Sequence, residues 1–377
     1  MVKKIFCFTA VLLLTANTAI AQKIAYVWGL TDGKEEFNDA LGEQEKTQAW
    51  FDQTFVNTEL GATGDGKFLN PAQITSNEDG CMDDVSVMWI NIDIPHKSYD
   101  ENTALLEDLD FILSVQDFVQ RGGTLFLTKE AVPMAHLIGR MCEPTEKGHG
   151  GFAFTDGALK LWVINANMGG VYDRTSHPIY NNISTDLTDG EGKAGYALMK
   201  TTSWMTDINT GWNDLYPKAE GITLDYTTEG VRANDDPEKL ADFEESWNCQ
   251  VLGTWGHIED YFGAFIVEFL PGMFNGEEWK GTVITCGPAA YQWVNENEYM
   301  DNVKTLSANA LNYLKSKAAL QPTSINIMHN DPSSLISHHS SIYDLQGRKV
   351  ADNLSSLISH PSSKPGIYII GGKKFIK

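Results

Sequence analysis

Five apolar runs recur along the chain, separated by stretches long enough to hold helices. They read "KIAYVWGL" (23–30), "VSVMWINIDI" (85–94), "TLFLTK" (124–129), "LKLWVIN" (159–165) and "GTVITCG" (281–287). The runs are nearly continuous and rich in β-branched residues, whereas a strand with one face in water alternates apolar and polar positions. This pattern predicts strands buried on both faces, as in a parallel sheet.

The stretches between the runs carry helical patterns at 35–55, 106–123 and 299–317. In 106–123 the periodic positions recur every three or four residues: Leu106, Leu109, Ile112, Leu113, Gln116 and Val119. That helix is expected to stop at Arg121, because Gly122 and Gly123 follow. Strands alternating with helices predict an α/β fold: a flavodoxin-like, doubly wound and mostly parallel sheet.

Two regions depart from this pattern. The region of about 140–250 is rich in Gly, Asp, Asn and Thr, which predicts a loop-rich insertion packed on one side of the sheet. Residues 318–340 read as a Ser- and Pro-bearing linker, and 341–377 as a small β tail that ends in a hairpin around Gly371-Gly372. The expected α/β body therefore spans 23–317.

The first 22 residues are expected to be a secretory signal peptide. Lys3 and Lys4 precede an apolar run and the small residues Ala19 and Ala21, with cleavage after Ala21. This run is too short to span a bilayer, and no later segment approaches 18 apolar residues, so no membrane insertion is expected. Loss of the two lysines changes the formal charge from -22 to -24. Such an acidic surface repels nucleic acid and anionic lipid but tolerates neutral polysaccharide or oligosaccharide.

The cysteines give no sign of a metal centre. Those of the expected mature chain are far apart and include no C-x-x-C pair: Cys81, Cys142, Cys249 and Cys286. A zinc knuckle or a thioredoxin-type motif is therefore absent, and no metal or other cofactor is expected. In an exported chain these thiols are able to form one or two disulfides, and the sequence leaves every pairing open.

The tail resembles the C-terminal sorting segments of exported Bacteroidota proteins. The resemblance lies in "IYDLQGRKV" (342–350), "KPGIYII" (364–370) and the final "KKFIK" (373–377). It implies recognition by a secretion machinery and a destination at the cell surface or outside the cell, with the periplasm as the alternative.

The body resembles the class I glutamine-amidotransferase-like fold, in the branch of the trehalose-utilisation proteins. The resemblance lies in "FVQRGGTLFLT" (118–128), "SHPIYNNI" (176–183), and "VLGTWG" (251–256) with "WKGTVITCGPAAYQW" (279–293). Over 23–317 the chain is also similar to a family of secreted Bacteroidota proteins. That second resemblance implies a role in polysaccharide utilisation, notably of fructan.

The chain departs from the amidotransferases at their nucleophile. Those enzymes need a cysteine on a sharp strand-to-helix turn, G-x-C-x-G. Here "TLFLTK" is followed by "EAVPMAHLIG" (130–139), so no cysteine or serine is expected at the turn, and Glu130 or Ala131 occupies its neighbourhood. Cys142 lies about a dozen residues later and is expected to be a buried or disulfide-bonded thiol. The sequence therefore favours a protein that is not an enzyme, with no catalytic residue assigned.

Candidate ligand-binding residues follow the predicted strands, because open α/β sheets bind ligands beyond the carboxyl ends of their strands. Aromatic rings, carboxylates and amides at these ends are suited to a neutral sugar, although ordinary capped strand ends have the same composition. The candidates are Trp28, Asp32, Asp93, Glu130, His136, Trp255, His257 and Glu259; Asn91, His96 and Lys129 lie beside them.

The stretch "TWGHIEDYF" (254–262) holds three of these candidates. As a metal site, His257 with Glu259 or Asp260 matches no established ligand spacing. The favoured interpretation is a connection in which Trp255 ends one strand and "YFGAFIVEF" (261–269) returns as the next. The side chains of this hairpin could bind a ligand as well, since the two interpretations are compatible.

Three functions remain open at this point. The first is an exported, non-catalytic glycan-binding protein of a polysaccharide-utilisation system. The second is a glycan hydrolase that uses carboxylates at the strand ends, since glycoside hydrolysis requires two of them. The third is a structural or assembly component of a surface complex. The glycan, the oligomeric state and cleavage of the tail are left open.

Overall fold

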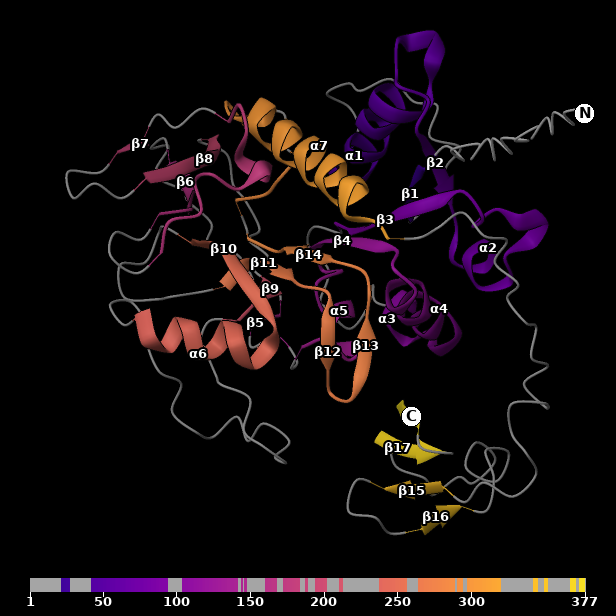
Figure 1. The fold of residues 1–377 in the computed structure, drawn as a ribbon. Coiled ribbons are helices and arrows are strands. Elements are labelled where there is room, and N and C mark those ends of the chain that lie inside the picture. The colour runs from indigo at the N-terminus through magenta and orange to yellow at the C-terminus, as the bar shows by residue number, and fades with distance from the viewer. Residues whose placement is uncertain are drawn as a thin grey trace, which may run out of the picture.

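A ten-stranded sheet forms the middle layer of the body in the computed structural model (Figure 1). The structure describes residues 22–27, 42–93, 104–141, 144, 146–147, 160–167, 172–183, 187–188, 194–201, 210–212, 237–255, 264–288, 290–293, 297–319, 342–344, 349–351, 367–370 and 373–376. In spatial order the strands are β2 (Gly66–Leu69), β1 (Lys23–Val27), β3 (Val85–Ile92), β4 (Thr124–Lys129), β14 (Val283–Cys286), β11 (Ala264–Phe269), β10 (Cys249–Trp255), β6 (Lys160–Asn165), β8 (Ala194–Thr201) and β7 (Leu187–Thr188).

The sheet has a parallel part and an antiparallel part. Strands β2, β1, β3, β4 and β14 all run parallel to their neighbours. From β11 to β7 each strand runs antiparallel to the one before it. The predicted mixed α/β class with a parallel central sheet is confirmed. The run 159–165, expected to join the parallel strands, instead forms the antiparallel strand β6; burial on both faces makes a strand apolar in either direction.

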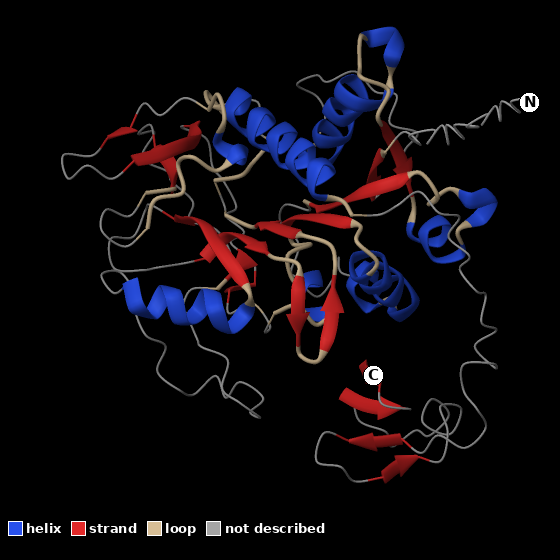
Figure 2. Ribbon diagram, viewed as in Figure 1, coloured by secondary structure: helices blue, strands red, loops and turns tan. Residues whose placement is uncertain are grey.

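Helices cover both faces of the sheet (Figure 2). On one face lie α1 (Glu43–Phe51), which continues as a π-helical turn over Asp52–Val56, and the long α7 (Met300–Lys317). On the other lie α2 (Pro71–Ser76), α3 (Ala104–Glu107), α4 (Leu109–Gln120), α5 (Met134–Leu137) and α6 (Pro237–Trp247). The sheet therefore separates two cores, which explains why its central strands are apolar on both sides.

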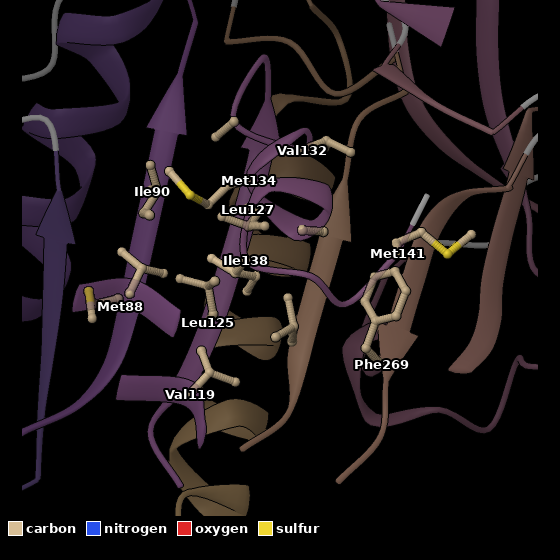
Figure 3. Packing of buried hydrophobic residues seen from close by; sticks show 14 of the residues in the cluster. Met88, Ile90, Val119, Leu125, Leu127, Val132, Met134, Ile138, Met141 and Phe269 are labelled. Carbon is tan, nitrogen blue, oxygen red and sulfur yellow. The ribbon is translucent and has the colours of Figure 1, made fainter. Parts of the chain in front are cut away.

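The two cores differ in composition. Between the sheet and α4 and α5 the packing is mainly aliphatic: Figure 3 shows Ile90 and Leu127 of the sheet against Val119 and Ile138. The core under α1 and α7 is aromatic. The ring centroids of Tyr26 and Trp89 lie 4.9 Å apart, and those of Trp50 and Trp293 5.2 Å apart. Edge-on and tilted contacts of this kind add to the free energy gained from burial alone.

The predicted helix 106–123 is two helices. Asp108 interrupts the apolar pattern with an extended backbone, and its carboxylate accepts a hydrogen bond from the backbone N–H of Phe111 at 3.0 Å. This is an N-cap, which starts α4 and ends α3. The predicted stop is confirmed, because α4 ends before Arg121 and Gly122 has a φ of 109°.

The region of about 140–250 contributes strands as well as a covering helix. Strands β6, β7 and β8 extend the sheet sideways, whereas α6 packs on the face that it shares with α4. The short elements of the body are β5 (Glu146–Lys147), β9 (Thr210–Gly211), the hairpin β12 (Gly272–Phe274) and β13 (Glu277–Trp279), and 3-10 turns at Thr58–Leu60, Glu78–Gly80 and Pro178–Tyr180.

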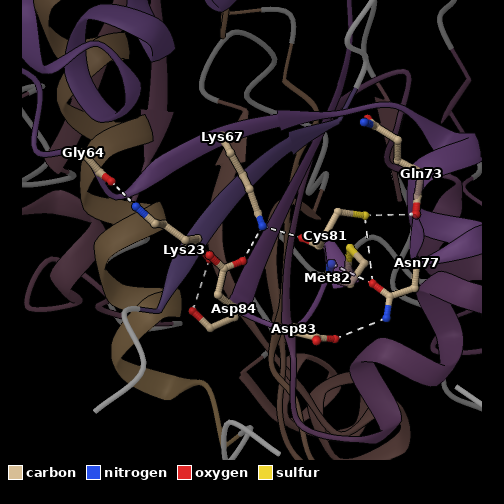
Figure 4. A network of polar contacts seen from close by, with 10 residues as sticks. Lys23, Gly64, Lys67, Gln73, Asn77, Cys81, Met82, Asp83 and Asp84 are labelled. Atoms are coloured by element: carbon tan, nitrogen blue, oxygen red, sulfur yellow. Dashed lines mark hydrogen bonds and ion pairs between the residues drawn. The ribbon is translucent and has the colours of Figure 1, made fainter. Parts of the chain in front are cut away.

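Polar contacts tie the amino ends of β1, β2 and β3 together (Figure 4). The ammonium group of Lys67 donates to the carboxylate of Asp84 and to the carbonyl of Cys81. The thiol of Cys81 donates to the carbonyl of Gln73 at 3.3 Å, and burial raises its pKa. Cys81 and Cys286 are free thiols, and Cys142 lies outside the described residues.

The tail forms a sheet of its own. Its strands are β15 (Ile342–Asp344), β16 (Lys349–Ala351), β17 (Ile367–Ile370) and β18 (Lys373–Ile376), in the order β16-β15-β17-β18. The hairpin β17–β18 brackets Gly371-Gly372, which lie outside the described residues. Among the described strands, these four pair only with each other.

Removal of residues 320–377 is therefore expected to leave the body folded. The cut keeps the last described backbone bond of the body, from Ala319 N–H to the carbonyl of Gly122 at 3.0 Å. We expect the Tm to change by less than about 2 °C in thermal unfolding followed by circular dichroism. As a control, truncation after Tyr313 also removes Leu314, which is fully buried and whose carbonyl accepts from Thr124, and should lower the Tm strongly. A large loss from the longer variant would show that the tail belongs to the core.

Candidate functional site

The carboxyl ends of β3, β4 and β14 lie side by side and place three chemically active side chains at one edge of the sheet. Ile92 pairs with Lys129, and Thr128 pairs with Cys286. Asp93 follows β3 directly. This is the edge at which open α/β sheets bind ligands. The parallel topology therefore brings Asp93, Lys129 and Cys286, which are far apart in the sequence, into one candidate site.

Lys129 occupies the sharp turn at the end of β4. Its φ is 58°, in the left-handed region, and the chain turns there through residues 130–133 into α5. For a residue with a side chain this backbone costs about 1 to 2 kcal/mol, and such strain gathers at functional sites. The lysine is only 2% exposed. Glu130 and Ala131 follow Lys129 within the turn, in the neighbourhood expected for them, but the residue with left-handed backbone is the last one of the strand.

Asp93 and Glu43 form a carboxyl pair next to this turn. Asp93 is 3% exposed, and its N–H donates to Oε1 of Gln44 at 2.8 Å. Burial raises the pKa of Asp93 well above its usual range; repulsion by Glu43 and a hydrogen bond with it raise the pKa further, against the opposing field of Lys129. Oδ2 of Asp93 and Oε2 of Glu43 are shielded from solvent, and apart from the bond between the two acids no partner is described for these atoms. Two acids this close cannot both ionise readily, and the effect falls on the pKa of Asp93.

A network of buried hydrogen bonds fixes the floor beneath the pair. Thr128 donates to Oδ1 of Asn91 at 2.5 Å and accepts from the indole N–H of Trp89 at 2.9 Å. Nδ2 of Asn91 and Nε2 of Gln44 both donate to the hydroxyl of Tyr26, at 3.0 and 2.9 Å. Fully satisfied buried networks hold their members in one arrangement. The ends of β1, β3 and β4 are thereby locked to the first turn of α1.

The one cysteine described at this edge is not an activated nucleophile. Burial raises the pKa of the Cys286 thiol, and the positive field of Lys129 opposes this only in part. The side chain is 1% exposed. Because the thiolate is the reactive form, Cys286 behaves as a small apolar core residue.

Two other predicted residues of this edge, Glu130 and His136, make contacts of their own outside the carboxyl pair. Glu130 is 5% exposed, and its N–H donates to the carbonyl of Ile92 at 3.1 Å, which ties the turn to β3. His136 lies in α5, where Nδ1 is 3.1 Å from the carbonyl of Met141. Asn91, named beside the candidates, belongs to the network above.

Several predicted candidates lie where the structure gives no description. Trp28, Asp32, His96, His257 and Glu259 are outside the described residues. Trp255 ends β10 and pairs with Ile164 of β6, but its side chain is not described either. Strands β10 and β11 are antiparallel neighbours, as the hairpin interpretation of this stretch requires.

Two residues of the site escaped the sequence analysis or were given only a minor place. Glu43 was not a candidate, because it follows β1 by sixteen positions and nothing in the pattern marked it as the first residue of a helix. Lys129 was named only as a neighbour, although its place at the end of "TLFLTK" was the available signal.

The element "SHPIYNNI" serves packing at the other edge of the sheet. Nε2 of His177 is 3.4 Å from Oε2 of Glu268, and the hydroxyl of Tyr313 donates to Oε1 of Glu268 at 2.7 Å. The ring centroids of His177 and Tyr313 lie 4.8 Å apart. Glu268 is buried, and burial raises the pKa of Tyr313. This trio ties the turn Pro178–Tyr180 to α7 and β11.

Within the described part of the chain, no group of three or more His, Cys, Asp or Glu side chains is arranged to hold a metal ion. None of the helices described is long and apolar enough to cross a membrane. The chemistry of the site therefore has to be argued from its carboxyl pair, its lysine and its hydrogen-bond network.

Comparison with known proteins leaves the family open. No protein-family model matches the chain, and no curated protein matches it. Among solved structures it is similar to the cytoplasmic protein STM3548 from Salmonella typhimurium, with 12% identity over 78% of this chain and 98% of that one and a TM-score of 0.33. It is also similar to PurLQS from Thermotoga maritima, with 10% identity over 78% and 99% of the two chains and a TM-score of 0.36.

Proposed function

We propose that this chain is an exported, non-catalytic carbohydrate-binding protein of a polysaccharide-utilisation system, built on an amidotransferase-like α/β domain. Its binding site is the carboxyl edge of the parallel strands. The observation that carries the proposal is Lys129, which has left-handed backbone at the strand-to-helix turn after β4. The resemblance to the amidotransferases implies that their cysteine belongs at this turn. A buried lysine beside acids holds and orients a ligand but provides no thiolate.

The charge and hydrogen-bonding groups of this edge support a neutral ligand. Asp93 and Glu43 oppose Lys129, so the site has no excess of positive charge to attract phosphate or sulfate groups. Carboxyl and amide groups in a fixed arrangement recognise sugar hydroxyls, which both donate and accept hydrogen bonds. Neutral polysaccharide or oligosaccharide is therefore the proposed ligand class, and fructan is placed first because of the resemblance of residues 23–317 to the secreted Bacteroidota family.

A carboxylate-dependent glycan hydrolase is the second candidate. The observation in its favour is the raised pKa of Asp93, because a general acid needs a raised pKa. Its partner Glu43 argues against this role, since the two groups are hydrogen bonded to each other. A glycosidase places its two carboxyl groups roughly 5 to 9.5 Å apart, on opposite sides of the bond that breaks.

Export and surface attachment complete the proposal. They rest on the signal-like start of the chain and on the tail, which together imply a route through a secretion machinery to the cell surface or beyond, or to the periplasm. In this setting the third candidate, an assembly component of a surface complex, predicts a protein partner in pull-down experiments and no affinity for sugars.

Isothermal titration of the mature chain against a panel of polysaccharides, including inulin- and levan-type fructans, tests the proposal. We expect binding without release of reducing sugar.

Trp255→Ala should weaken binding and leave the fold intact, because an indole stacks on a sugar ring. Cys81→Ser at the opposite edge should change neither binding nor folding. Absence of binding to every glycan would overturn the proposal. Release of reducing sugar that Asp93→Asn, Glu130→Gln or Glu259→Gln abolishes would establish the hydrolase instead.

A further inference from the structure

The first turn of α1 is held by the end of β3 rather than by a cap of its own. Gly42 precedes the helix and offers no side chain to cap it, and the next four residues, "EQEK", are all polar. Instead, Gln44 accepts from the N–H of Asp93 at 2.8 Å and donates to the carbonyl of Asn91 at 3.1 Å. Glu43 is hydrogen bonded to the carboxyl group of Asp93. The start of the helix therefore depends on polar contacts with one strand end.

We propose that Asp93 and Glu43 form a proton-dependent clasp, which holds the first turn of α1 on β3 while Asp93 is protonated and releases that turn alone when the proton is lost. In the closed state the O–H of Asp93 donates to the carboxylate of Glu43. When this proton passes to solvent, two carboxylates face each other and repel. The inference goes beyond the proposed function, because it requires no ligand and no space for one.

The surroundings of the clasp keep the proton on Asp93. Burial raises the pKa of Asp93 most, and the charge of Glu43 and the hydrogen bond with it act in the same direction. Other titratable groups come from the elements packed around the two acids: Glu45 of α1, Tyr26 of β1, Lys129 of β4 and Cys286 of β14. The glutamate raises the pKa of Asp93 further and the lysine lowers it. The phenol and the thiol stay neutral, because burial raises their pKa values.

The end of α1 is held by apolar contacts that do not depend on this proton. Its last two residues are Trp50 and Phe51. The ring centroids of Trp50 and Trp293 lie 5.2 Å apart, and those of Phe51 and Tyr26 lie 5.3 Å apart. A segment held by polar contacts opens at a lower free-energy cost than one packed in an apolar core. Loss of the clasp therefore frees the first turn and leaves the end of the helix in place.

The clasp is closed at low pH and opens as the pH rises. In the closed state the pKa of Asp93 is raised well above its usual range, whereas in the open state the carboxyl group returns to water and to a pKa of about 3.9. Between these two values the closed state binds more protons than the open state. The equilibrium constant for opening therefore rises by up to about tenfold for each pH unit in this interval and levels off above the raised pKa.

Hydrogen exchange of the intact mature chain, followed by mass spectrometry from about pH 5 to about pH 9, tests the clasp. The reporters are the N–H of Asp93 and the N–H of Lys46, which donates to the carbonyl of Gly42 at 2.9 Å. Their protection factors should fall by up to about tenfold for each pH unit and then level off. The amides of β14 report unfolding of the whole body. At the alkaline end, the two reporters should be less protected than β14 by about tenfold or more.

Three variants separate the clasp from other causes of opening. Asp93→Asn removes the titrating group, so the protection of the first turn should no longer depend on pH. Glu43→Gln removes the repulsion but not the burial of Asp93, so it should reduce the pH dependence without abolishing it. Asp83→Asn, at the opposite edge, should keep the wild-type profile. A wild-type profile in Asp93→Asn or in Glu43→Gln would overturn the clasp. Reporters as well protected as β14 at every pH would also overturn it, because the turn would then open only when the whole body unfolds.

Discussion

Gly281→Ala is expected to destabilise the protein by about 3 kcal/mol or more, because the new methyl group would clash with backbone atoms. A Cβ at this position would lie 1.8 Å from the carbonyl oxygen of Gly123 and 2.8 Å from that of Val119. These are backbone atoms at the junction of α4 and β4, so they cannot rotate away as a side chain would. The N–H of Gly281 also donates to the carbonyl of Val119 at 2.9 Å.

The matched control for this prediction is Gly276→Ala, at the turn between β12 and β13. Its φ is 79°, but nothing lies within 4 Å of the new Cβ. Only backbone strain of about 1 to 2 kcal/mol is expected there. Urea unfolding followed by circular dichroism gives both free energies of unfolding. Equal losses for the two variants would mean that the close approach of β14 to the end of α4 does not limit stability.

This close contact shows what the sequence does and does not disclose about the fold. The two elements that meet there, "RGG" and "KGT", were recognisable as a helix stop and a strand start, and β4 has the predicted bounds, Thr124–Lys129. Strand direction was not recognisable for β6. A run covered on both faces is apolar whether its neighbours are parallel or antiparallel, so only the connections decide.

The prediction of helix boundaries was limited by a similar ambiguity in the sequence pattern. The apolar spacing continues from Leu106 to Ile112 across Asp108, so the pattern alone favours one helix. The carboxylate of Asp108 competes by capping Phe111 and starting a new helix. A capping residue inside an apolar pattern is therefore a better guide to a break than the pattern itself.

The candidate site was predictable where a residue directly follows a strand. Asp93 and Glu130 were found in this way. Glu43 was not, because its position depends on where the chain after β1 begins α1 and on how that helix lies over the sheet. Lys129 was placed only approximately, since a lysine in left-handed backbone is rare and its neighbours in sequence give no sign of it.

Asp93→Asn is expected to stabilise the protein at neutral and alkaline pH, although it alters the centre of the proposed site. The sign follows from proton linkage. The pKa of Asp93 is raised in the folded state, so the folded protein binds more protons than the unfolded chain between the two pKa values. Stability is fully present below the unfolded pKa and falls, by up to about 1.4 kcal/mol per pH unit, as the pH rises toward the folded pKa.

An asparagine at this position removes the free-energy cost of keeping or ionising a buried acid, because it never ionises and its amide can donate to Glu43. The wild type and the variant should have similar free energies of unfolding near pH 4 and should diverge as the pH rises toward the folded pKa of Asp93. The measurement is urea unfolding at a series of pH values, and Asp83→Asn at the opposite edge provides a control that should track the wild type. A variant that is less stable than the wild type at pH 8 would show that Asp93 is ionised and well paired in the fold. If the stabilisation is found, the protein retains at the end of β3 an acid that weakens its fold, which is expected of a residue kept for binding rather than for stability.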